Sequence, residues 1–140
     1  MASITLRGRE IPLFYSTLEM KMIQEQIGPI SRAVDLMMGR NPDSDDPNDS
    51  SKFGGAEHLD ALGKFIVMMG NAALEEEGKE PDLTEKWVLR SLKPKEIIVA
   101  IQQVLGAMSE GMQSEIPDKE DDGPVDVTLE EMNKKKAKDD

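Results

Sequence analysis

The sequence predicts a mainly α-helical protein in which an N-terminal β-hairpin packs on a small bundle of about five helices. Three observations support this fold class. Residues 4–13 alternate between apolar and polar side chains, as strands do. Five later segments repeat apolar residues at helical spacing, and this period stops after Gln113. We therefore expect one domain over residues 1–113 and a disordered, charged, acidic C-terminal tail over residues 114–140.

The hairpin is predicted by its alternation and its turn. The pair Arg7-Gly8 is the natural two-residue turn, which pairs Leu6 with Arg9. In this register all the large apolar residues of the two strands fall on one face. These residues are Ile4, Leu6, Ile11 and Leu13. Because an isolated hairpin is marginal in water, we expect this face to cover the helices.

The helices follow in order. Ser16 and Glu19 form a capping-box pattern that marks the start of the first helix, and Gly28-Pro29 separates it from the second. The third has its apolar stripe between residues 59 and 73, and the fourth starts at Thr84. The fifth begins around Pro94 and has the clearest stripe. We expect the last two helices to pack as an antiparallel pair.

Two segments lack helical patterning. Residues 39–55 are rich in Pro, Gly, Asp and Ser, with Phe53 as the single large apolar residue, so we expect a mobile acidic loop. Residues 114–140 are polar and contain two prolines. Within this tail, residues 127–136 could form a brief helix on a partner.

The composition limits the classes of function. Seventeen basic and 28 acidic residues give a net charge of −11, which argues against nucleic acid and membrane surfaces as partners. The chain has no cysteine, so disulfides and thiolate sites are excluded. No signal pattern or apolar run of membrane-spanning length occurs, so we expect a soluble intracellular protein.

The sequence offers no convincing catalytic, cofactor or metal site. His58, the only histidine, lacks converging partners in sequence, so a helix-surface position is the plainer interpretation. Glu75, Glu76 and Glu77 point in three directions on a helix, which favours a solvated helix end. No phosphate loop, dinucleotide glycine pattern, nucleophile elbow or zinc spacing occurs. We therefore predict no enzyme and no cofactor.

The acidic loop also matches part of a calcium-binding frame. Asp46, Asn48, Ser50 and Glu57 fall at positions 1, 3, 5 and 12 of an EF-hand-like pattern. Ser51 stands at the sixth position, where the sharp turn needs glycine. A solvated acidic loop is therefore the preferred interpretation, and no metal site is predicted.

Ten methionines give the chain an unusual amount of flexible apolar surface. Most are expected to fill the core. The functional interpretation is an adaptable groove that accepts a long helical partner, as Met-rich surfaces do elsewhere. The candidate partner-binding residues lie on the first and last helices: Met20, Met22, Met108 and Met112.

Three segments together resemble a known family. The hairpin "ITLRGREIPLFYS", the capped helix "TLEMKMIQEQIG" and the late segment "LKPKEIIVAI" are similar to the tail assembly chaperones of long-tailed bacteriophages and their prophages. The similarity covers most of the region from Ile4 to Met112. It rests on the order of elements and on the size and polarity of side chains.

The resemblance implies a specific function. Such chaperones bind the tape measure protein in the host cytoplasm, keep it soluble and help recruit the tail tube protein. They do so without catalysis. A second copy of the chain is a further candidate partner. Many are made in two forms by ribosomal frameshifting, and Lys134, Lys135 and Lys136 are what an A-rich slippery site could encode. The high negative charge would keep a coated apolar client in solution.

Two other classes of protein fit the same sequence. One is a structural protein of the virion, such as a head–tail connector or a tail-end subunit. The other is a small acidic helical adaptor or regulator. Peptides of this chain at stoichiometric amounts in purified particles would favour the structural protein.

Overall fold

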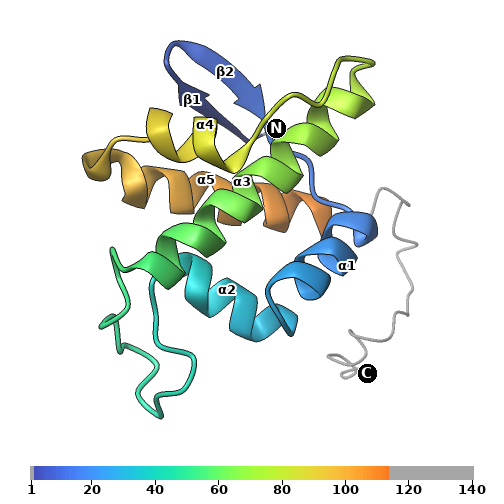
Figure 1. Ribbon diagram of the computed structural model, residues 1–140. Coiled ribbons are helices and arrows are strands. Elements are labelled where there is room, and N and C mark those ends of the chain that lie inside the picture. The colour runs from blue at the N-terminus through green and yellow to red at the C-terminus, as the bar shows by residue number, and fades with distance from the viewer. Residues whose placement is uncertain (1, 114–140) are drawn as a thin grey trace, which may run out of the picture.

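The computed structural model describes residues 2–113, and Figure 1 shows a hairpin above a group of helices. The predicted tail and the lysines at 134–136 lie outside the described residues. The elements in chain order are β1 (Ser3–Leu6), β2 (Arg9–Pro12), α1 (Thr17–Gln26), α2 (Ile30–Met38), α3 (Ala56–Glu76), α4 (Glu85–Ser91), a 3-10 turn (Pro94–Glu96) and α5 (Ile97–Gly111). The predicted fold class, a hairpin with five helices, is confirmed.

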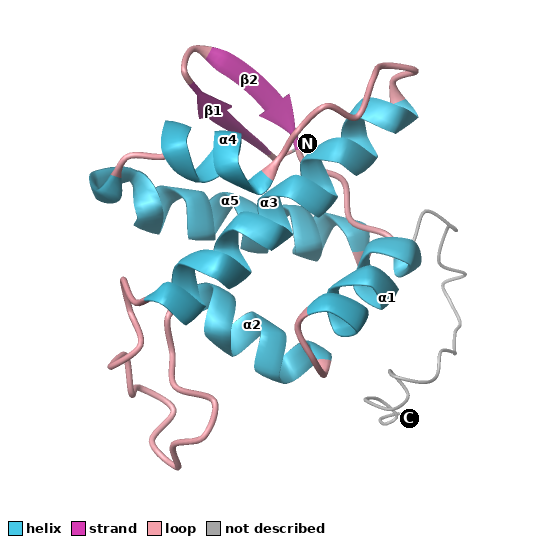
Figure 2. Cartoon of the chain, viewed as in Figure 1, coloured by secondary structure: helices cyan, strands magenta, loops and turns pink. Residues whose placement is uncertain are grey.

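Helix α3 is the centre of the fold. Its backbone approaches those of α1, α2, α4, α5 and β2, so the other elements are arranged around it (Figure 2). Buried residues occur all round its circumference, from His58 to Leu74, as expected of a helix covered on several sides. Two of its glycines, Gly63 and Gly70, allow close approach, since a Cβ there would lie within 3.2 Å of Leu89 and 2.5 Å of Leu83.

The hairpin has the predicted register. Ile4 pairs with Ile11 and Leu6 pairs with Arg9. Both turn residues have positive φ, 52° at Arg7 and 77° at Gly8, as a type I′ turn requires. The predicted apolar face is buried, with Ile4, Leu6, Ile11 and Leu13 all at most 6% exposed. A backbone hydrogen bond joins the segment after β2 to α3, since the Phe14 N–H donates to the Met69 carbonyl at 3.0 Å.

The predicted start of α1 and the bend after it are also confirmed. The Ser16 N–H donates to the Glu19 carboxylate at 3.0 Å, and the Ser16 hydroxyl bonds the same carboxylate. These bonds satisfy polar groups at the helix start. The chain then turns at Gly28, whose φ is 145°, and α2 begins after Pro29.

The predicted antiparallel pairing of the last two helices is wrong. Helix α4 instead packs against α3 near residues 63 and 64, as shown by the ion pair between Lys64 and Glu85 at 3.0 Å and by the contact of Leu89 with Gly63. Helix α5 lies mainly against β1. Gly63 has no side chain, so Leu89 of α4 can pack closely against α3 at this position. Helix α5 packs instead on β1, where it covers part of the buried face of the hairpin.

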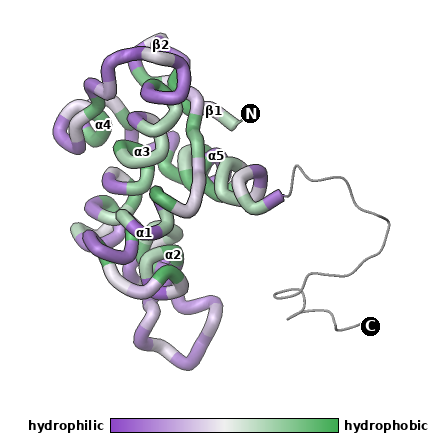
Figure 3. The backbone as a smooth tube through the Cα atoms, turned by 90° about the vertical axis from the view of Figure 1, so that its right-hand side faces the viewer, coloured by the Kyte–Doolittle hydropathy of each residue, from purple (hydrophilic) through white to green (hydrophobic). Residues whose placement is uncertain are grey.

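The loop at residues 39–55 has defined turns, and its mobility stays a prediction. The Asn41 N–H donates to the Asp49 carbonyl at 2.9 Å, which closes the loop on itself. Side-chain oxygens of Asn41, Ser44, Asp46 and Asp49 each accept from a backbone N–H two residues later. Figure 3 shows the loop as a hydrophilic extension at one end of the molecule.

Candidate functional site

An open groove of about 580 Å³ lies between α1, α3 and residues 81–85. Its apolar lining comes from two helices. The residues are Leu18 and Met22 of α1, and Val67, Met68 and Ala72 of α3. The position of each is set by helical spacing. Leu18 and Met22 are four residues apart, as are Met68 and Ala72, so each pair forms a short ridge along its helix.

Leu18 stands out among the groove residues because it is 55% exposed. It is the second residue of α1, a position fixed by the capping box at Ser16. The buried face of α1 is formed by Ile23, which is 0% exposed, so Leu18 is left at the edge of the contact between α1 and α3. An exposed leucine beside an apolar groove is a suitable first contact for an apolar partner.

The rim of the groove is acidic. Glu75 and Glu85 line it, together with Glu19, which is buried at 4% exposed and bonded to Ser16, and Lys64 is the one basic residue of its lining. The Lys64 ammonium donates to Asp60 and to Glu85, each at 3.0 Å, and the hydrogen bond to Asp60, followed by the one to Glu85, raises the pKa of Lys64. Lys64 and Glu85 therefore compensate each other, and the exposed carboxylate of Glu75 is the rim group that favours a basic side chain on a partner.

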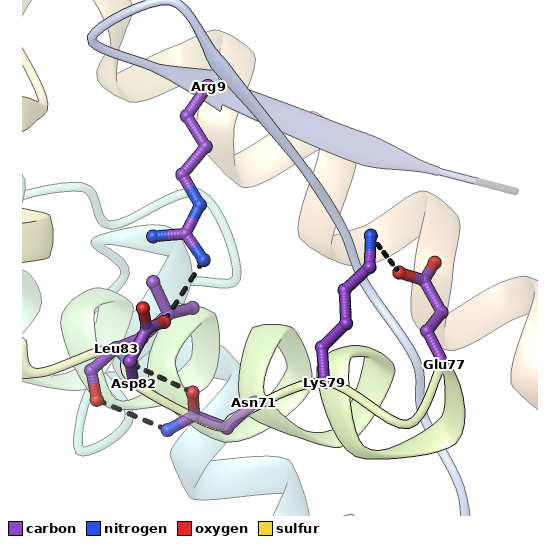
Figure 4. Close-up of polar contacts among 6 residues, drawn as sticks. All are labelled: Arg9, Asn71, Glu77, Lys79, Asp82 and Leu83. Carbon is purple, nitrogen blue, oxygen red and sulfur yellow. Dashed lines mark hydrogen bonds and ion pairs between the residues drawn. The ribbon is translucent and has the colours of Figure 1, made fainter.

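One wall of the groove is a loop that is fastened to α3, as Figure 4 shows. The Leu83 N–H donates to Asn71 Oδ1 at 2.9 Å, and Asn71 Nδ2 donates to the Leu83 carbonyl at 3.2 Å. The Arg9 guanidinium pairs with Asp82 at 3.0 Å, which adds a tie to the hairpin. Pro81 lines the groove beside these contacts. The groove thus has a preformed wall.

The structure brings only one of the four predicted methionines to this groove. Met22 lines it, whereas Met20, two positions away on α1, is half-buried against the core. Met108 is buried at 8% exposed and Met112, next to the end of α5, is 77% exposed. The four methionines do not line a single groove, so their role in partner binding stays a prediction for each residue separately.

Leu18 stands at helical spacing with Met22, so the sequence pattern predicts a buried position for it, and the pattern indicates no role for Val67. The signal that could have revealed Leu18 is its place in the first turn. A residue in the first turn lies where the chain enters the helix, and it is covered only if a neighbouring element reaches that far. The sequence does not show how far α3 extends past α1.

The expectation that His58 lies on a helix surface is wrong, because its side chain is 0% exposed. Its Nδ1 accepts from the Gly54 N–H at 2.9 Å, and the Phe53 ring lies 4.9 Å away, so His58 anchors the acidic loop to α3. Burial lowers the pKa of His58, and the Met37 carbonyl opposes only part of this effect. The histidine is therefore neutral at pH 7.

The acidic residues do not converge. Within residues 2–113, no group of three or more His, Cys, Asp or Glu side chains is arranged to hold a metal ion. Asp43 of the loop is paired with Arg32 at 2.7 Å, and this hydrogen bond lowers the pKa of the Asp43 carboxyl. Asp49 accepts from Ser51, which likewise lowers its pKa. These carboxylates stabilise turns of the loop.

The basic tip of the hairpin also has a structural use. Arg7 and Arg9 lie over the ring of Trp87 on α4, with their guanidinium carbons 6.0 Å and 5.8 Å from the ring centroid. Cations at this distance from an indole face are attracted by its ring electrons. The arginines therefore help fix the hairpin on α4.

Comparison of the chain with protein-family models, curated proteins and solved structures finds no match. The helices described in residues 2–113 include none long and apolar enough to cross a membrane.

Proposed function

We propose that the chain is a phage tail assembly chaperone that binds helical segments of the tape measure protein. The observation that carries this proposal is the groove between α1 and α3, with its apolar lining, its exposed Leu18 and its acidic rim. An amphipathic helix inserts apolar residues into such a groove, and basic residues on its flanks pair with the rim. The resemblance of the hairpin and first helix to this family names the client.

The function is binding without catalysis. The client would be held in the host cytoplasm, and recruitment of the tail tube protein would follow. The net charge of −11 keeps a complex of apolar client and chaperone in solution, since like-charged complexes repel one another. The same charge disfavours binding to nucleic acid.

The test is co-expression with the adjacent long helical gene product, with the soluble fraction of that product as the measurement. The intact chain should keep the product soluble and co-purify with it. Leu18→Glu should lower the soluble fraction several-fold, because the variant loses the apolar contact of the leucine and places a charged group against the apolar face of the client.

Ile98→Glu is the matched control. Ile98 is also the second residue of its helix and is 59% exposed, close to the 55% of Leu18, but it lies on α5 and outside the groove. The control should retain the client. Equal loss with both variants would show that the groove is not the binding site, and an insoluble product with the intact chain would contradict the chaperone function.

A further inference from the structure

The outer edge of β1 has no partner strand among the described residues. The sheet has two strands, β1 and β2. The Leu13 N–H donates to the Ala2 carbonyl at 3.0 Å, which makes Ala2 and Leu13 a hydrogen-bonded pair. Hydrogen-bonded pairs alternate along an antiparallel ladder, so Ile4–Ile11 and Leu6–Arg9 are the next such pairs. The N–H and C=O groups of Ser3 and Thr5 therefore point away from β2. Within residues 2–113 no backbone hydrogen bond from another element reaches them.

A second groove, of about 420 Å³, lies between this edge and α5. Its strand side is formed by residues 2–5 and its helix side includes Val99 and Gln103, which are four residues apart. Val99 is 55% exposed. A groove between an open strand edge and a helix suits an extended segment, which pairs with the strand and points alternate side chains at the helix.

The chain leaves α5 at one end of this groove. The Ala2 N–H donates to the Glu110 carboxylate at 3.0 Å, so the last turns of α5 lie beside the start of β1. Residues 114–124 span roughly 35 Å when fully extended. Because β1 is about 13 Å long, residues after 124 can reach either end of it.

Residues 125–129 read Val-Asp-Val-Thr-Leu. Apolar residues at 125, 127 and 129 alternate with polar ones, the period of a strand with one covered face, and β-branched residues are favoured in strands. The segment is close in length to β1. It is also the one stretch after Gln113 that combines these two features.

We propose that residues 125–129 add to the outer edge of β1 as a third strand within the same chain. Their apolar face would cover Val99, and their backbone would pair with Ser3 and Thr5. The sequence alone also allowed a brief helix from residue 127, but an open edge offers bonds to an extended backbone and none to a helix. The proposal is independent of the proposed function, since it concerns a groove that shares no lining residue with the groove between α1 and α3. Its consequence is a covered edge, which prevents pairing between sheets of different copies.

The test uses paramagnetic broadening in the full-length chain. The sequence has no cysteine, so Asp126→Cys gives one site for a nitroxide label on the face pointing away from α5. In ¹⁵N-labelled protein the oxidised label should broaden the amide signals of Ser3, Thr5 and Val99 beyond detection, and reduction of the nitroxide should restore them. The signal of Ser31, at the start of α2, should be unaffected.

Two further substitutions test the face of the segment. Adding Val127→Lys to the labelled chain should abolish the broadening, because the lysine replaces an apolar contact with α5. Adding Thr128→Lys, with the same change of charge on the outer face, should preserve it. Neither residue belongs to the described fold, so the signals of residues 2–113 report whether the domain is intact.

Two results would overturn the proposal. One is the absence of broadening at Ser3, Thr5 and Val99, which would mean that the segment does not occupy the groove. The other is broadening that arises only when chain carrying the nitroxide but no ¹⁵N is mixed with ¹⁵N-labelled chain that carries no nitroxide. That result would assign the groove to a second copy.

Discussion

Gly70 of α3 lies where three elements meet, and its replacement by alanine tests the packing around the central helix. A Cβ at this position would lie 2.5 Å from Leu83 Cδ1 and 3.1 Å from Ile11 Cγ2. Both neighbours are buried, at 5% and 1% exposed. Asn71 holds the Leu83 backbone with two hydrogen bonds, so only the Leu83 side chain can give way. The added methyl group therefore has to displace one of two buried side chains.

The expected magnitude combines two opposing effects. Alanine in place of glycine inside a helix stabilises by about 1 kcal/mol, since the unfolded chain loses less entropy. Overpacking a filled core costs about 1–3 kcal/mol. We expect Gly70→Ala to lower the free energy of unfolding by about 1 kcal/mol, a fall of about 4 °C in melting temperature for a domain of this size.

Gly106→Ala is the matched control. Gly106 is also inside a helix, α5, but a Cβ there meets only Ala2 Cβ, at the ordinary contact distance of 3.9 Å. This variant should be more stable than the parent by about 1 kcal/mol. The assay is urea unfolding followed by circular dichroism, with the slope of the transition checked for each variant. If Gly70→Ala stabilised the chain as much as Gly106→Ala, the close approach of α3, the hairpin and the loop before α4 would be refuted.

Three other predictions concern single contacts. Burial lowers the pKa of His58 in the folded chain below its ordinary value of 6.5. Near and below pH 6.5 the unfolded chain therefore binds more protons than the folded chain. The free energy of unfolding should fall by up to about 1.4 kcal/mol per pH unit as the pH is lowered through this range. His58→Asn, which keeps an acceptor for Gly54, should flatten this dependence in urea titrations from about pH 7 to about pH 5.5; an unchanged slope would contradict a buried neutral histidine. Asn71→Ala should cost about 1–3 kcal/mol in the same assay, because the Leu83 N–H and carbonyl lose their partner, and a change below about 0.5 kcal/mol would contradict a fastened wall. Lys21→Ala should change stability by less than about 0.5 kcal/mol, because Lys21 and Glu25 form an exposed pair on α1, and a loss above about 1 kcal/mol would show an unseen contact of Lys21.

Local features of this fold could be predicted from the sequence because they depend on near neighbours. The turn at Arg7-Gly8 determined the pairing of Ile4 with Ile11, and the capping box at Ser16 determined where α1 begins. Each depends on a few adjacent residues. Their signals therefore remain readable without knowledge of the rest of the chain.

Features that depend on distant residues were missed or wrong. The pairing of α4 with α3 depends on Gly63, whose missing side chain matters only once Leu89 is beside it. His58 looked like a surface residue because its partners, Gly54 and the Phe53 ring, come from a loop that was expected to be mobile. The groove beside Leu18 depends on where α1 crosses α3, which no local pattern states.

The most direct measurement of the proposed function is site-specific photo-crosslinking of the chain when it is co-expressed with a tape measure protein. A photoreactive residue in place of Leu18 should form adducts with the co-expressed tape measure protein, and the adducts should map to segments with an amphipathic helical pattern. The same residue in place of Ile98 on α5 should give few. Adducts from position 98 with none from position 18 would contradict binding of the client in the groove between α1 and α3.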